Sequence, residues 1–173
     1  MQVRYPQIMK YSPVVFIVSF VLTLSPSIIQ AAAPQGYQFL NLTEAWQQAV
    51  AQNKPMFLYF GRYGCSICRK MHQEVFSDPQ VKENYNNRFV LAYVDTESGN
   101  RITMPNGERT TEMQFATHSR ILGTPTFIYY ANDQKPLFKK TGFQSIDQMN
   151  LYSDFIDKGL YKTGTLKDYL ATQ

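Results

Sequence analysis

Apolar and polar positions along the chain follow two patterns: a spacing of about 3.6 residues, typical of helices, and short continuous apolar runs, typical of buried strands. The two clearest apolar runs are Met56–Phe60 and Phe89–Val94, and both are apolar enough to be buried on both faces. Helical spacing precedes, separates and follows them. The first half therefore predicts a helix over 41–54 with Trp46 and Val50 on its buried face, a helix from Cys65 with Ile67, Met71 and Val75 on one stripe, and a short helix from Pro79 to Tyr85.

The second half of the chain repeats this alternation after an interruption. Residues 97–109 are polar, with a Pro-Asn-Gly turn signal and the apolar pair Ile102 and Met104, so we expect an inserted loop or hairpin carrying a small apolar ridge. After it the pattern predicts a helix from a Thr111–Gln114 capping box to about Leu122, strands at Phe127–Tyr130 and around Leu137–Phe138, a helix from a Ser145–Gln148 capping box to Lys158, and a short helix in 163–173. Helices and strands that alternate in this way predict an α/β domain.

The N-terminus carries the features of a secretory signal peptide. Arg4 and Lys10 form a basic region, Val14–Leu24 is an apolar core, and 31–33 is an Ala-Ala-Ala cleavage site. The apolar core is too short to span a bilayer, although an uncleaved anchor is the alternative. We expect residues 1–33 to be the signal peptide and 34–173 to form a single domain.

Charge and cysteine content narrow the function. Of the 17 Lys and Arg residues two lie in 1–33, so residues 34–173 carry 15 against 13 Asp and Glu, a net charge of +2. This charge is too small to indicate a nucleic-acid partner, and we expect a monomer. In an exported chain, cysteines that served stability would be expected as separated structural disulfides. The only two cysteines here, Cys65 and Cys68, lie in one C-x-x-C motif.

This motif predicts thiol–disulfide chemistry. Cys65 falls at a helix N-terminus, where free backbone N–H groups and the helix dipole favour a thiolate. Cys68 lies three residues later on the same helix face, close enough for the two sulfurs to form and break a bond. A bridge that closes so short a loop would add little stability as a structural crosslink. A metal-binding module is the alternative from another class, with His72 and His118 as further ligands of the cysteines.

Five segments of the chain follow the pattern of a known family. They are Lys54-Pro-Met-Phe-Leu-Tyr-Phe-Gly61, Cys65-x-x-Cys68, Glu74-Val-Phe-Ser-Asp-Pro79, Val94-Asp95 and Ile121-Leu-Gly-Thr-Pro125-Thr126. Together they resemble the thioredoxin-like superfamily, and within it the exported group that includes SoxW-type proteins and the C-terminal domain of DsbD. The resemblance implies a thioredoxin fold: a central mixed β-sheet flanked by helices, here with the insertion before the helix that leads to Pro125.

The resemblance also implies a site and a role. Pro125 is expected to be cis and to lie against the cysteines, with the backbone of Thr124 presented to a substrate's extended chain. Gly64, where many thioredoxins have tryptophan, is expected to leave Cys65 open to substrate. The implied function is reduction of protein disulfides in the periplasm, with electrons from a membrane donor of the DsbD or CcdA type and no bound cofactor.

Two departures from the family leave questions open. Tyr59 stands where thioredoxins usually carry a buried acid, so the acceptor of the Cys68 proton is undetermined; His72 and Glu74 are candidates, and simple packing is the alternative for His72. Ser66 and Ile67 match neither the residues of strong oxidases nor those of strong reductases. An oxidase that donates its disulfide is therefore the alternative within the class.

Overall fold

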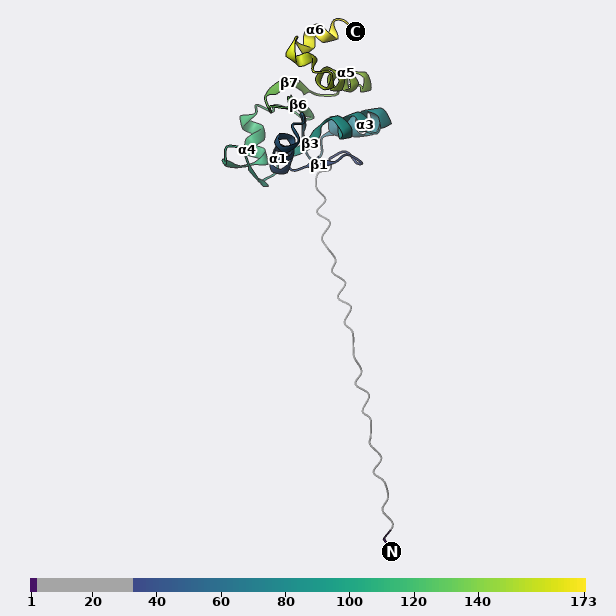
Figure 1. The fold of residues 1–173 in the computed structure, drawn as a ribbon, viewed down its shortest axis with the longest axis vertical. Coiled ribbons are helices and arrows are strands. Elements are labelled where there is room, and N and C mark those ends of the chain that lie inside the picture. The colour runs from purple at the N-terminus through teal and green to yellow at the C-terminus, as the bar shows by residue number, and fades with distance from the viewer. Residues whose placement is uncertain (3–32) are drawn as a thin grey trace.

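The computed structural model describes residues 1–2 and 33–173, so the expected signal peptide lies almost wholly outside the described residues. The main sheet has the strand order β1-β3-β2-β6-β7 (Figure 1). Strands β1, β3 and β2 are parallel, and β6 and β7 continue the sheet in antiparallel pairing. The strands are β1 (Phe39–Leu40), β2 (Met56–Gly61), β3 (Val90–Asp95), β6 (Thr126–Tyr130) and β7 (Pro136–Thr141).

Helices cover both faces of this sheet, and Figure 1 shows α1 and α4 lying together, apart from α3 and α5. One face packs against α1 and α4, while the other packs against α2, α3 and α5. The helices are α1 (Leu42–Gln52), α2 (Ser66–Glu74), α3 (Pro79–Arg88), α4 (Glu112–His118), α5 (Ile146–Asp157) and α6 (Leu166–Leu170), with a 3-10 turn at Leu160–Lys162. The predicted α/β class is confirmed.

The two faces differ in composition. The face toward α2, α3 and α5 is dominated by aromatic rings; the ring centroid of Phe127, for example, lies 5.5 Å from that of Phe57 and 5.2 Å from that of Tyr59. The opposite face is mostly aliphatic, and the single tryptophan, Trp46, packs there edge-on against Tyr130. Alternate residues of β2 contribute to opposite faces, as the two-residue period of a strand requires.

The capping predictions are confirmed at both boxes, Thr111 with Gln114 and Ser145 with Gln148. Other details differ from expectation. Val50 and Ile67 are exposed rather than buried, so the stripes on α1 and α2 are narrower than the sequence suggested. Helix α4 ends at His118 instead of about Leu122, because Arg120 adopts a left-handed conformation with φ of 53° that a helix cannot accommodate.

The insertion forms a hairpin of β4 (Arg101–Thr103) and β5 (Arg109–Thr111). It is tied to α1 because the hydroxyl of Thr43 donates to the carbonyl of Thr103 and accepts from its N–H. The expected exposed ridge is wrong: Ile102 is buried in the aliphatic core and Met104 is partly buried against it. A strand alternates sides, so the polar neighbours of Ile102 face solvent while Ile102 faces inward.

Within the described part of the chain, none of the helices is long and apolar enough to cross a membrane.

Candidate functional site

The turn between β2 and α2 places Cys65 at the edge of the sheet. Strand β2 ends at Gly61, where a Cβ atom would lie 2.7 Å from the hydroxyl oxygen of Tyr93, so only glycine fits beside this ring. Gly64 has a φ of 72°, a left-handed conformation that favours glycine. Two closely spaced glycines thus turn the chain from the strand into the helix, and Cys65 follows as the N-cap residue of α2.

Cys65 and Cys68 are joined by a disulfide, with their Cα atoms 5.2 Å apart. The backbone N–H of Cys68 donates a hydrogen bond of 3.1 Å to the Sγ atom of Cys65, which is therefore the side-chain cap of the helix. This geometry would stabilise a thiolate on Cys65 once the disulfide is opened.

The exposure of the two cysteines differs less than expected. The side chain of Cys65 is 9% exposed and that of Cys68 is 5% exposed. The sequence predicted an open Cys65, but in the disulfide form both cysteines are largely covered. What separates the two sulfurs is the kind of surface on each side of the disulfide.

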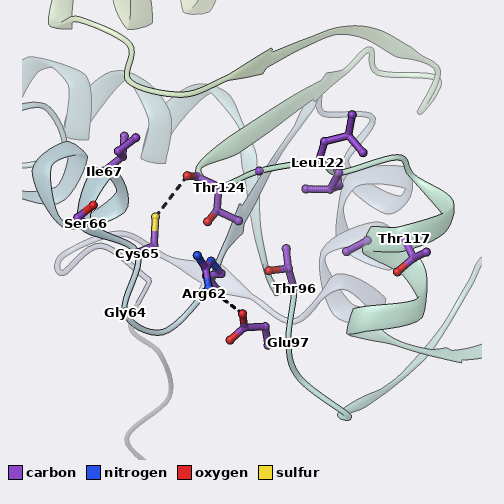
Figure 2. A pocket seen from close by; sticks show the side chains of 13 residues that line it. Arg62, Gly64, Cys65, Ser66, Ile67, Thr96, Glu97, Thr117, Leu122 and Thr124 are labelled. Atoms are coloured by element: carbon purple, nitrogen blue, oxygen red, sulfur yellow. Dashed lines mark hydrogen bonds and ion pairs between the residues drawn. The ribbon is translucent and has the colours of Figure 1, made fainter.

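A groove of about 510 Å³ lies on the side of Cys65. Figure 2 shows it between the start of α2 and helix α4, with the ion pair of Arg62 and Glu97, 2.9 Å between Nη1 and Oε1, across one end. We call it the Cys65 groove. It is lined by Arg62, Gly64, Cys65, Ser66, Ile67, Thr96, Glu97, Ala116, Thr117 and residues 121–124.

The loop before β6 forms the wall of the groove next to the sulfur. The Sγ atom of Cys65 lies 3.4 Å from the carbonyl oxygen of Thr124 (Figure 2). In the disulfide this sulfur carries no proton, so the contact becomes a hydrogen bond only when Cys65 is a thiol. The peptide bond between Thr124 and Pro125 is cis. Leu122, in the same loop, is 98% exposed and adds an apolar surface to the groove.

A second hollow, of about 350 Å³, lies on the side of Cys68. We call it the Cys68 pocket. It is lined by Tyr59, Arg62, Tyr63, Gly64, Cys65, Cys68, Arg69, His72 and Tyr93. Inside it the hydroxyl oxygen of Tyr59 lies 3.0 Å from the Nε2 atom of His72.

The electrostatics of this pocket follow from burial. Burial lowers the pKa of His72, because the protein interior disfavours the charged imidazolium. Burial also raises the pKa of Tyr59 far above its ordinary value, with a smaller contribution from Tyr93. At neutral pH the pair therefore consists of a neutral imidazole and a protonated hydroxyl.

The other residues proposed from sequence are placed differently. Glu74 is exposed, forms a long ion pair of 3.9 Å with Lys70, and is not among the described residues that line the Cys68 pocket. His118 is on α4 and His72 on α2. In the stretch that the structure describes, no group of three or more His, Cys, Asp or Glu side chains is arranged to hold a metal ion.

Sequence comparisons match this architecture. A family model described as a thioredoxin-like domain matches residues 42–156, well over half of the chain. The thiol:disulfide interchange protein DsbD of Salmonella paratyphi A is 27% identical over 123 residues, covering 69% of this chain and 20% of the relative. DsbD of Campylobacter jejuni is 29% identical over 114 residues, covering 65% of this chain and 18% of that relative. The chain thus spans about a fifth of the length of these relatives.

Solved structures agree on the fold. A thioredoxin-fold protein from Helicobacter pylori superposes with a TM-score of 0.60 at 20% identity, covering 70% of this chain and 84% of that one. A thioredoxin from Thermus thermophilus gives a TM-score of 0.55 at 25% identity, covering 68% of this chain and 84% of that one. The predicted thioredoxin fold, a mixed sheet flanked by helices, is confirmed. The chain therefore belongs to the thioredoxin-like family, and the predicted enzyme class, thiol–disulfide oxidoreductase, is confirmed at the level of that family.

Proposed function

We propose that this protein is exported to the periplasm, where it reduces disulfides in other proteins. The observation that carries the proposal is the position of Cys65: its sulfur caps α2, accepts the N–H of Cys68 and borders a groove open to a substrate. A sulfur that is stabilised as a thiolate and also reachable by a second molecule is suited to attack a disulfide.

The reaction moves two electrons from the cysteine pair to the target. The Cys65 thiolate attacks one sulfur of the target disulfide, and the other target sulfur leaves as a thiolate and is protonated. Cys68 then loses its proton and attacks the Sγ atom of Cys65, which releases the second target sulfur. The pair ends as the Cys65–Cys68 disulfide, and the target ends as two thiols.

The loop at Thr124 positions the target. Its carbonyl oxygen, 3.4 Å from the Cys65 sulfur, is a backbone acceptor at the point of attack. An extended target segment lying in the groove can donate a backbone N–H to such an acceptor and so add as a short strand. In this role Pro125 fixes the loop, and Gly64, which has no side chain, leaves room beside the attacked sulfur.

Electrons must be returned to the pair after each turnover. We infer a membrane donor of the DsbD or CcdA type, because a reductase in an oxidising compartment needs a supply of reducing equivalents. The basic and apolar leader of residues 1–33 supports export, and the names of the matched relatives support a place in disulfide interchange.

The reduction potential tests the direction of the reaction. The protein is equilibrated with glutathione and dithiothreitol buffers, and the fraction of the Cys65–Cys68 disulfide is read by thiol labelling. A reductase should lie near the thioredoxin value of about −270 mV, and a disulfide-donating oxidase near about −120 mV. The reduced protein should also reduce a protein disulfide, while the Cys65→Ser/Cys68→Ser variant should not. A potential close to −120 mV would establish the oxidase instead.

A further inference from the structure

If the protein works as proposed, Cys68 must lose a proton before it attacks Cys65. This step requires a base close to Cys68, and the inference below rests on the proposed function in this respect. A free cysteine thiol has a pKa of about 8.5, so at neutral pH most such thiols are protonated and inert as nucleophiles. Cys68 is only 5% exposed, which limits direct proton loss to bulk water. The protein must therefore offer an acceptor next to Cys68.

The Cys68 pocket contains one base of suitable strength. Among the described residues that line it, none is a carboxylate, and Arg62 and Arg69 are permanent cations. Tyr59 and Tyr93 are protonated phenols, because burial raises the pKa of each. The neutral imidazole of His72 remains, and it lies four residues after Cys68 on the same face of α2.

The hydrogen bond with Tyr59 fixes which nitrogen of His72 accepts. The Tyr59 hydroxyl has no other hydrogen-bond acceptor in the described region, so it donates to Nε2 over 3.0 Å. The ring of Tyr59 is fully buried and is held edge-on by Tyr93 and by His72 itself. Phe76 packs edge-on against the imidazole and stacks on the ring of Tyr59. The pair is thus rigid, and the lone pair of Nε2 points toward the hydroxyl rather than toward solvent.

We propose that Tyr59 and His72 form a proton relay for the resolving cysteine. As Cys68 becomes a thiolate, its proton passes to the Tyr59 oxygen, directly or through water in the pocket, and the Tyr59 proton passes to Nε2 of His72. Cys68 then attacks Cys65 and the target sulfur leaves. The Nε2 proton of the imidazolium then returns through the Tyr59 hydroxyl to water in the pocket, and the released target thiolate takes a proton from water. When a donor reduces the disulfide, the same relay runs backwards and protonates Cys68. His72 is the final proton acceptor, and the Tyr59 hydroxyl carries the proton between the sulfur and His72.

The test separates attack from resolution by using a chromogenic disulfide, dithiobis(nitrobenzoate), with the fully reduced full-length protein. The first release of thionitrobenzoate reports the attack of Cys65, and the second reports resolution by Cys68. General acid–base assistance contributes roughly 10²- to 10⁴-fold in enzymes. We expect Tyr59→Phe and His72→Gln each to slow the second phase at neutral pH by at least about tenfold, with the first phase unchanged.

The pH profile of the second phase distinguishes a relay from a packing effect. The titratable and charged groups that line the pocket with His72 are Tyr59 from β2, Tyr93 from β3, Arg62, Tyr63 and Cys65 from the turn before α2, and Cys68 and Arg69 from α2 itself. In the native protein the second phase should slow on the acid side, where His72 becomes protonated. In both variants this inflection should disappear. The rate should instead rise with pH up to the pKa of a free thiol, about 8.5.

Tyr63→Phe is the matched control, because Tyr63 lines the same pocket but is 81% exposed and makes no hydrogen bond to His72 in the described region. This variant should keep both the second-phase rate and its inflection. The proposal is overturned by a normal second phase in His72→Gln, by equal slowing of both phases, or by the same slowing in Tyr63→Phe. This assay needs only the cysteine pair, so a wild-type protein that cannot reduce protein disulfides would refute the proposed function while leaving the relay standing.

Discussion

The two sides of the Cys65–Cys68 disulfide have different surroundings. On the Cys65 side the groove is open, bordered by backbone, by an exposed ion pair and by the exposed Leu122. On the Cys68 side the pocket is walled by aromatic rings and contains the Tyr59–His72 hydrogen bond. The sulfurs themselves differ in exposure by only a few percent. The surroundings of the two cysteines therefore distinguish their roles more than their exposure does. The Cys65 side can receive a second molecule, and the Cys68 side can accept a proton.

The largest effect is expected when the sulfurs are removed one at a time. Cys65→Ser lacks the attacking sulfur, so exchange should fall to the uncatalysed rate. Cys68→Ser still attacks but cannot resolve, so a covalent adduct with the target should accumulate. Mass spectrometry under non-reducing conditions counts the adduct, and dithiothreitol should release it. In Cys68→Ser the remaining thiol should react with iodoacetamide well below about pH 8. An adduct on Cys65→Ser instead would reverse the roles of the two sides.

A smaller effect is expected from the apolar edge of the Cys65 groove. Leu122→Asp should leave the melting temperature unchanged, because the side chain is almost fully exposed. It should slow reduction of a protein disulfide by roughly tenfold, equivalent to about 1.4 kcal/mol, if Leu122 contacts the target. The reaction with dithiobis(nitrobenzoate) should change less.

Val50→Asp provides the control for this variant. Val50 is also an exposed apolar residue, but it lies on α1, outside the Cys65 groove. It should leave both reactions unchanged. Equal slowing by the two aspartates would show that surface charge, and not the groove, controls the rate.

The smallest effect is a pH dependence of stability that originates in the Cys68 pocket. Burial lowers the pKa of His72 in the folded protein below its ordinary value of about 6.5. As the pH falls below about 6.5, the unfolded chain binds this proton first, so the folded state loses stability until the pH passes the folded pKa. Above that window His72 contributes no pH dependence.

Urea unfolding of the oxidised protein between about pH 8 and pH 5 measures this effect. His72→Gln should have a flatter curve below about pH 6.5 than the native protein. His118→Gln, which replaces an exposed histidine on α4, should keep the native slope. Identical curves for all three proteins would contradict the prediction that burial lowers the pKa of His72 in the folded protein.

Features that depend on neighbouring residues could be predicted from sequence. The strand, turn and helix around Cys65 follow from local spacing, and so do both capping boxes, whose partners are three residues apart. The Tyr59–His72 pair could not be predicted in this way. Its members are 13 residues apart, on a strand and a helix, and meet only because α2 packs on the face of β2 that carries Tyr59. The burial of Ile102 was not predicted for the same reason, because the polar sequence around it does not indicate that the hairpin folds back onto α1.

The position of Trp46 decides how this protein can be observed. The only indole of the chain packs on the aliphatic face of the sheet, against Tyr130, while α2, which begins at the disulfide, packs on the aromatic face. A disulfide quenches tryptophan emission at close contact, and Trp46 is not among the described residues that line the two sides of the disulfide. We therefore expect intrinsic tryptophan fluorescence to report the folding of the domain rather than the redox state of its sulfurs.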